Sequence, residues 1–166
     1  MAVNIIDNFL DKESFQKLQD HMMGPWFPWV YNDALLTGVS DDSLYDFQFV
    51  HTFYKDHKPH SDLLHILDPI LAKIQPAAVL RIKANLNPRT ENLYQHQMHR
   101  DVDNYKCTTA LFYINSNDGY TIFEDGTKVE SVANRFVSFD STMMHAGTSC
   151  TDQKIRIAIN FNYHSW

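Results

Sequence analysis

The stretch Lys154-Ile-Arg-Ile-Ala-Ile-Asn-Phe-Asn-Tyr163 alternates between apolar and mostly polar side chains. Successive side chains of a β-strand point to opposite faces, so this period of two predicts a strand over 154–163. One face carries Ile155, Ile157, Ile159 and Phe161, and the other carries Arg156, Ala158, Asn160 and Asn162. A half-exposed strand would give the same pattern. If instead the apolar face packs on helices, the other face looks into the interior, where Arg156 needs an anionic partner.

Short β-rich segments recur along the chain from residue 77 onward. They are 78–86, 94–101, 106–115, 119–123, 127–132, 135–139 and 154–163. Turn-forming residues separate them, namely Asn87-Pro88, Asp118-Gly119, Asp125-Gly126 and Asn134. Many short strands at this spacing favour a sandwich or a barrel.

The first part of the chain combines helices with two strands. Val3 to Ile6 and Phe47 to Tyr54 are each predicted as a strand. Asp11 caps a predicted helix that carries Phe15, Leu18 and Met22 and ends at Gly24-Pro25. A second helix is predicted after Ser61, with a restart at Pro69 for which Asp68 is the expected cap. We therefore expect a single domain over 1–166, mainly β with flanking helices, in which residues 1–76 support a β core at about 77–166.

Composition restricts the function less than it restricts the fold. The 166 residues are 44% apolar and 20% charged, with a net charge of −6 and no basic cluster, which disfavours duplex binding but leaves a nucleotide substrate open. No apolar run approaches the ~20 residues of a membrane span, and no secretory signal is visible, so we expect a cytoplasmic protein. Cys107 and Cys150 match no metal motif and are expected to be reduced thiols, although the sequence does not exclude a disulfide.

His99, Asp101 and His145 are candidate metal ligands. His99 and Asp101 are two positions apart, so on a strand both side chains would point to the same face, with His145 supplied by a neighbouring strand. Two imidazoles and one carboxylate form the facial triad that holds non-haem Fe(II) and leaves its other positions open. The two-residue spacing alone is weak evidence, because it occurs by chance in many proteins.

The sequence segments around these residues are more specific evidence than this spacing. Residues 106–115 resemble the strand that follows the His-x-Asp ligands in prolyl-hydroxylase-type 2-oxoglutarate/Fe(II) oxygenases. Residues 118–126 resemble the Gly-Gly-x-Thr-x-Phe segment of that family, with Asp118 in place of the first glycine. Residues 129–147 resemble its Val-x-Pro to His-x-Gly segment, with a looser match at the turn. The resemblance covers about residues 80–163.

The resemblance implies a double-stranded β-helix, or jelly-roll, core with the N-terminal helices packed on one sheet. It also implies roles for individual residues. His99, Asp101 and His145 match the iron ligands, and Arg156 matches the cation that pairs with the distal carboxylate of 2-oxoglutarate. Tyr113 matches a position whose hydroxyl helps to hold the same carboxylate, and Thr121 matches a position that lines the co-substrate pocket in some relatives. Asn87 falls near a position where many relatives have a tyrosine that faces the co-substrate.

The implied activity is a dioxygenase reaction that hydroxylates an unactivated C–H bond and yields succinate and CO2. Its cofactors would be Fe(II), 2-oxoglutarate and O2, with ascorbate as a candidate reductant. The alternative is a non-catalytic jelly-roll module that binds a ligand or metal. The substrate stays open between a prolyl or other peptidyl residue, a free amino acid and another small molecule, and the sequence does not decide the oligomeric state.

Overall fold

The computed structural model of the chain describes residues 3–34, 44–102 and 106–166. The strands of these ranges are β1 (Asn4–Ile6), β2 (Val30–Asn32), β3 (Gln48–Lys55), β4 (Lys58–Pro59), β5 (Ala78–Pro88), β6 (Thr108–Tyr113), β7 (Tyr120–Phe123), β8 (Lys128–Glu130), β9 (Phe136–Asp140), β10 (His145–Gly147) and β11 (Ile155–His164). The helical elements are α1 (Lys12–Met23), the 3-10 helix η1 (Asp62–Leu67) and α2 (Asp68–Ile74). Within the described ranges, no helix has the length and apolar content needed to cross a bilayer.

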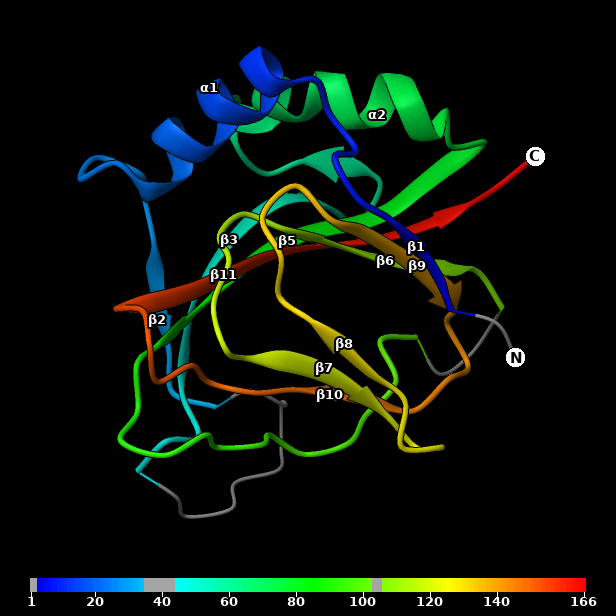
Figure 1. Ribbon diagram of the computed structural model, residues 1–166. Coiled ribbons are helices and arrows are strands. Elements are labelled where there is room, and N and C mark those ends of the chain that lie inside the picture. Colours follow the sequence, from blue (N-terminus) through cyan, green and yellow to red (C-terminus); the bar gives the residue numbers. More distant parts are fainter. Residues whose placement is uncertain (1–2, 35–43, 103–105) are drawn as a thin grey trace.

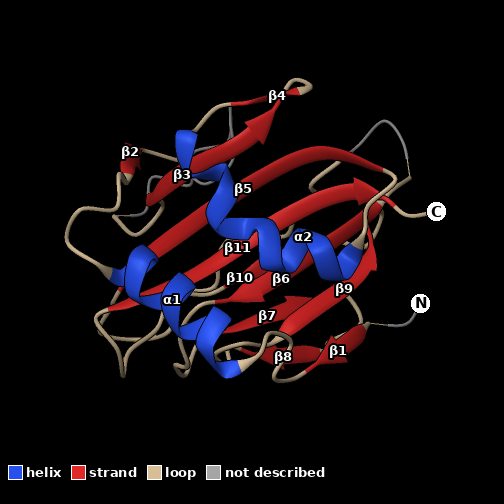
Figure 2. Ribbon diagram, turned by 90° about the horizontal axis from the view of Figure 1, so that it is seen from above, coloured by secondary structure: helices blue, strands red, loops and turns tan. Residues whose placement is uncertain are grey.

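A large antiparallel sheet forms the centre of the molecule. Its strand order is β1-β9-β6-β11-β5-β3-β2, with β4 paired to β3. The helices cover one face of this sheet, and a smaller sheet lies on the other side (Figure 1). The view from above shows α1 and α2 lying across the strands of the large sheet (Figure 2). The structure therefore confirms the mainly β fold with helices on one outer face, and its large sheet takes strands from both the first and the second part of the chain.

The apolar face of β11 packs under the helices, as the alternation in 154–163 predicts. Ile157 and Ile159 are fully buried in the same cluster as Met22 of α1 and Ile70 of α2. Because side chains alternate along a strand, the opposite face of β11 points between the two sheets. This orientation places Arg156 in the interior of the molecule.

The smaller sheet has the order β10-β7-β8 and is extended by an irregular segment. Gln95 pairs with Thr148 and His99 pairs with His145 as isolated bridges, so residues 95–99 run beside β10 without forming a regular strand. The predicted strand over 94–101 is therefore wrong. The segment Gln95-His-Gln-Met-His99 has no apolar face to bury. The two facing sheets form the jelly-roll core.

The two predicted helices exist, with one correction. The Asp11 side chain accepts a hydrogen bond from the Ser14 backbone N–H and caps α1, which ends at Gly24 as predicted. Ser61 caps η1 through the Leu63 N–H. Asp68 does not cap α2, because η1 runs directly into it and the Asp68 N–H already bonds to the His65 carbonyl.

The turn predictions succeed at Gly126 and fail at Asn87-Pro88. Gly126 has φ of +85° between β7 and β8, a backbone conformation that glycine adopts without strain. β5 instead continues through Pro88, since Asn87 pairs with Arg156 and Pro88 with Ile155 of β11. Pro88 lies at the last position of the strand, where its missing N–H interrupts no ladder. Cys107 and Cys150 are buried free thiols, as expected.

Candidate metal centre and adjoining pocket

A pocket opens between the two sheets, with a volume of about 580 Å³ including its open mouth. The large sheet supplies polar side chains from β3, β5 and β11, and the small sheet supplies residues of β7 and β10. Its lining consists of Gln48, Asn85, Asn87, His96, His99, Asp101, Leu111, Thr121, His145, Gly147, Arg156, Ala158 and Asn160.

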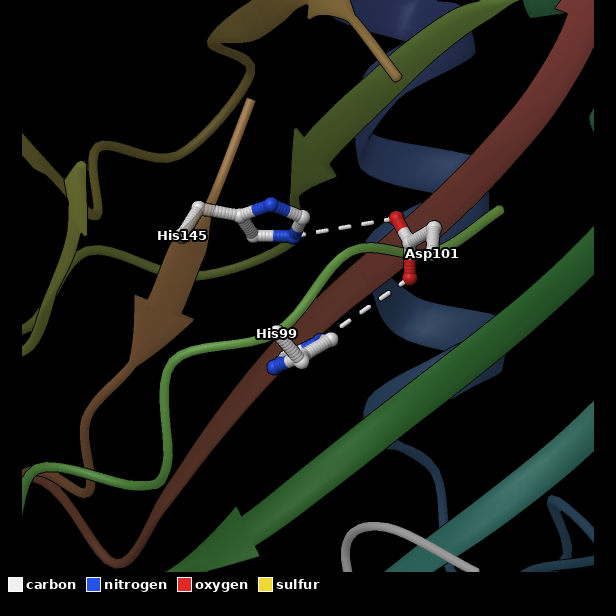
Figure 3. Close-up of side chains that lie close together, drawn as sticks. All are labelled: His99, Asp101 and His145. Carbon is white, nitrogen blue, oxygen red and sulfur yellow. Dashed lines mark ion pairs between the residues drawn. The ribbon is translucent and has the colours of Figure 1, made fainter. Parts of the chain in front are cut away.

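The three candidate metal ligands meet in this pocket. One donor atom from each of His99, Asp101 and His145 lies within 4.8 Å of the others. The Nε2 atoms of His99 and His145 are 3.9 Å and 3.7 Å from the Asp101 carboxylate oxygens (Figure 3). The backbone pairing of His99 with His145 brings the first ligand beside the third, and Asp101 follows two residues later.

Both histidines have the tautomer that a metal ligand needs. The Nδ1 atom of His99 lies 3.0 Å from the Gln97 carbonyl oxygen, and that of His145 lies 3.1 Å from the Met143 carbonyl oxygen. A carbonyl only accepts hydrogen bonds, so each Nδ1 carries the hydrogen and each Nε2 presents its lone pair toward Asp101. Burial also lowers the pKa of His145, which favours its neutral form.

Asp101 is anchored to the large sheet through both carboxylate oxygens. Arg81 of β5 donates to Oδ1 at 2.9 Å, and the Asn160 side chain of β11 donates to Oδ2 at 2.7 Å. Burial alone would raise the pKa of Asp101, but the nearby charges of His145 and Arg81 and the Asn160 hydrogen bond lower it to about 2. The carboxylate is therefore ionised at neutral pH. Two imidazoles and one carboxylate fit a divalent iron-type ion.

Arg156 is a buried cation at one side of this pocket. Its Nε donates to the Ser131 hydroxyl at 2.8 Å and its Nη2 to the Thr121 hydroxyl at 3.3 Å. Within the described part of the chain it forms no ion pair, although its side chain is only 4% exposed. A guanidinium has five N–H donors, so several stay available for a ligand. A buried charge without a counter-ion is costly, which makes an anionic ligand the natural partner.

Two glycines provide the space that Arg156 occupies. A Cβ at position 119 would lie 2.8 Å from Arg156 Cδ and 2.5 Å from the Ser149 carbonyl oxygen. A Cβ at Gly147 would lie 3.4 Å from Arg156 Nη1. Close approach of the guanidinium to the backbone therefore explains glycine at position 119 and favours it at position 147.

Tyr113 and Thr121 lie next to Arg156. The hydroxyls of the two residues are 2.8 Å apart, and the Arg156 guanidinium carbon is 5.4 Å from the centre of the Tyr113 ring. Tyr113 is fully buried and packs between the sheets with Leu111 and Val137, whereas Thr121 lines the pocket directly. Burial raises the pKa of Tyr113, so its hydroxyl stays protonated.

The structure thus brings together all six residues that the sequence singles out, and it adds others that were missed. Arg81 and Asn160 hold Asp101, and Asn85 contributes to the pocket wall. The sequence pattern could have indicated Arg81 and Asn85, because residues 81, 83, 85 and 87 are polar and alternate with apolar residues of the buried face. Asn87, which falls near a position where many relatives have tyrosine, lines the pocket.

Comparison with solved structures identifies the class of fold. No family model matches the chain, and no curated protein matches it. Solved structures that match include 2-oxoglutarate/Fe(II) oxygenases, prolyl hydroxylases among them, so the chain has the fold of this class and resembles its prolyl hydroxylase group.

The matching structures described next cover nearly the whole chain. A prolyl hydroxylase from Trichoplax adhaerens, solved with a peptide fragment of hypoxia inducible factor, aligns with a TM-score of 0.69 at 18% identity over 98% of this chain and 83% of its own. A prolyl-4-hydroxylase from Pseudomonas putida aligns with a TM-score of 0.60 at 15% identity over 98% and 92%. HygX from Streptomyces hygroscopicus, solved with nickel and 2-oxoglutarate, aligns with a TM-score of 0.63 at 11% identity over 98% and 82%.

Proposed function

We propose that the chain is a 2-oxoglutarate/Fe(II)-dependent dioxygenase that hydroxylates an unactivated C–H bond of a small-molecule or peptidyl substrate. One observation carries the proposal: a buried arginine, with no counter-ion in the described part of the chain, shares a pocket with two imidazoles and an ionised carboxylate. A metal-binding module needs the three ligands only. The additional buried cation is explained by an anionic co-substrate bound beside the metal.

In this proposal His99, Asp101 and His145 hold Fe(II). The carbonyl oxygens of Gln97 and Met143 fix the imidazole tautomers, and Arg81 and Asn160 fix the carboxylate. Bound Fe(II) and 2-oxoglutarate supply the oxidising chemistry, in which O2 is consumed, 2-oxoglutarate gives succinate and CO2, and one C–H bond becomes C–OH. The chain contributes orientation, charge neutralisation and shielding from water.

Arg156 binds the distal carboxylate of 2-oxoglutarate, with Thr121 and Tyr113 in support. The Thr121 oxygen accepts from Arg156 and can donate its own hydrogen to the Tyr113 oxygen. The Tyr113 O–H hydrogen then stays available for the same carboxylate. Two donors of a planar guanidinium fit the two oxygens of a carboxylate, which gives direction as well as affinity.

The test measures succinate formation with Fe(II), 2-oxoglutarate, O2 and ascorbate over a panel of candidate substrates. We expect substrate-stimulated succinate formation, lost in His99→Ala and Asp101→Ala. His65→Ala is the matched control, because His65 is exposed on η1 and far along the chain from the pocket. Metal binding without 2-oxoglutarate consumption over the whole panel would support the non-catalytic module instead.

A further inference from the structure

Lys83 lies in the polar row of β5 that includes Asn85 and Asn87; these two residues line the pocket, and Lys83 stands next to them outside the lining. Its neighbours in the strand, Ile82 and Ala84, are buried under the helices, so the Lys83 side chain points to the opposite face. On that face it stands between Arg81, which contacts Asp101, and Asn85, which lines the pocket. Its cross-strand partners are Asn160 on β11 and Thr52 on β3, so it lies inside the sheet and not at an edge.

The positive charge of Lys83 has no counter-ion among the described residues. The nearest carboxylate along this row, Asp101, is already bonded to Arg81 and Asn160. Lys83 is half-buried and makes no hydrogen bond or ion pair within the described ranges. Burial, together with the charges of Arg81 and Lys55, lowers the pKa of Lys83 to about 8, and the charge of Asp101 opposes this shift only in part. An anionic ligand bound beside Lys83 would stabilise the charged form of its amine.

Two hydrogen-bond acceptors beside Lys83 also lack partners. The side-chain oxygens of Asn85 and Asn160 are buried and accept no hydrogen bond in the described structure. The orientation of the Asn160 amide is fixed, because its Nδ2 donates to the Asp101 carboxylate. Buried acceptors of this kind are normally satisfied, so they favour a ligand with N–H or O–H groups.

We infer that Lys83 binds a carboxylate of the primary substrate, and that Asn85 and Asn160 accept hydrogen bonds from an amino or hydroxyl group of the same molecule. This inference rests on the proposed function and narrows its substrate class. The substrate is then a small amino or hydroxy acid with a free carboxylate, and not an internal residue of a peptide. Arg81 is neutralised by Asp101, which leaves one unit of charge at Lys83 to match a single carboxylate.

The site is distinct from the one assigned to 2-oxoglutarate. Arg156 stands opposite Asn87 of β5, whereas Lys83 is four residues earlier in the same strand. Four residues of an extended strand span ~13 Å, so the two cations stand at well-separated positions along β5. Two anionic molecules can therefore be held at the same time, one by each cation.

The first experiment uses binding and needs no turnover. The protein is treated with a limiting amine-acetylating reagent, and the modification of each lysine is quantified by mass spectrometry. The probes are free L-amino acids and α-hydroxy acids, their primary amides, and 2-oxoglutarate alone. We expect at least one free acid to slow the labelling of Lys83 about fivefold or more, while its amide does not. The absence of protection by every acid, equal protection by an amide, or protection by 2-oxoglutarate alone would overturn the inference.

The second experiment separates Lys83 from the rest of the site by kinetics. Lys83→Met removes the charge at similar length, and we expect it to raise the KM for the protecting acid about 30-fold, far more than the KM for 2-oxoglutarate. Lys83→Arg keeps the charge, so its KM for the protecting acid should stay within about fivefold of the wild-type value. Lys17→Met, at an exposed position of α1 where Lys17 pairs with Glu13, is the matched control and should leave both constants unchanged.

The two proposals fail in different ways. If no 2-oxoglutarate is consumed but an acid still protects Lys83, the dioxygenase proposal is wrong and the carboxylate site stands. If 2-oxoglutarate is consumed and Lys83→Met has the KM of wild type for its substrate, the carboxylate site is wrong and the dioxygenase proposal stands.

Discussion

Replacing Arg156 with glutamine tests whether this side chain binds the co-substrate. The substitution removes a buried guanidinium whose remaining donors face the pocket beside the metal ligands. A hydrogen bond to a charged group contributes about 1.5–3 kcal/mol, so loss of a bidentate contact costs at least about 3 kcal/mol. At 1.4 kcal/mol per decade, this predicts a Kd for 2-oxoglutarate that rises by about 100-fold or more. Arg156→Lys keeps one charged contact, so its Kd for 2-oxoglutarate should rise only about 10-fold.

The assay is calorimetric titration of 2-oxoglutarate into protein loaded with Mn(II), which avoids oxidation during the measurement. Arg135→Gln is the matched control, because Arg135 pairs with Asp7 away from the pocket and its loss should leave the Kd unchanged. Circular dichroism confirms that each variant is folded. A folded Arg156→Gln protein that binds 2-oxoglutarate within threefold of wild type would refute the assignment of this residue.

Three further predictions concern stability. Asn134→Ala should lower the free energy of unfolding in urea by about 3 kcal/mol, because it removes two hydrogen bonds to the Leu10 backbone, at 2.9 Å and 2.8 Å, and forces alanine into φ of +62°. Asn134→Gly removes the same hydrogen bonds but tolerates this φ, so its free energy of unfolding should fall by about 1 kcal/mol less. Equal decreases in the two variants would argue against backbone strain. The fold lowers the pKa of Asp101 from 3.8 to about 2, so in metal-free protein the ionised carboxylate stabilises the fold above pH 3.8 and loses this effect as the pH falls through 2. The difference in unfolding free energy between wild type and Asp101→Asn should therefore shrink by about 2 kcal/mol from pH 5 to pH 2. A difference that stays constant over this range would contradict the low pKa. Mn(II) at 100 times its Kd should raise the Tm of wild type by about 5–10 °C and leave the Tm of His99→Ala unchanged, as measured by calorimetry. An equal rise in both proteins would mean that the metal binds elsewhere.

Much of the large sheet could be predicted because its strands obey a simple rule. Where one face of a strand is buried, the period of two in the sequence is strong, as in β5 and β11. The same rule fails at residues 94–101, which have a partner on one side only and no apolar face. It also misses β10, a three-residue strand whose pairing is decided by the chain opposite to it.

The candidate site was predictable in its residue types and less so in its surroundings. His99, Asp101 and Arg156 could be found because motif spacing and strand alternation mark them. The strand geometry expected for His99 and Asp101 is wrong, and their proximity comes instead from the pairing of His99 with His145. Arg81 and Lys83 were missed, because a charged residue in a strand has a functional meaning only when the neighbouring strands show which face is enclosed.

The division of the candidate ligands between the two sheets has a mechanical consequence. The histidines belong to the small sheet, while Arg81 and Asn160 tie Asp101 to the large sheet. An ion held by all three would act as a clamp between the two layers. Without such an ion, the two layers are joined here only by contacts between polar side chains, and we expect less force to separate them. Resistance to pulling would then report directly on metal occupancy.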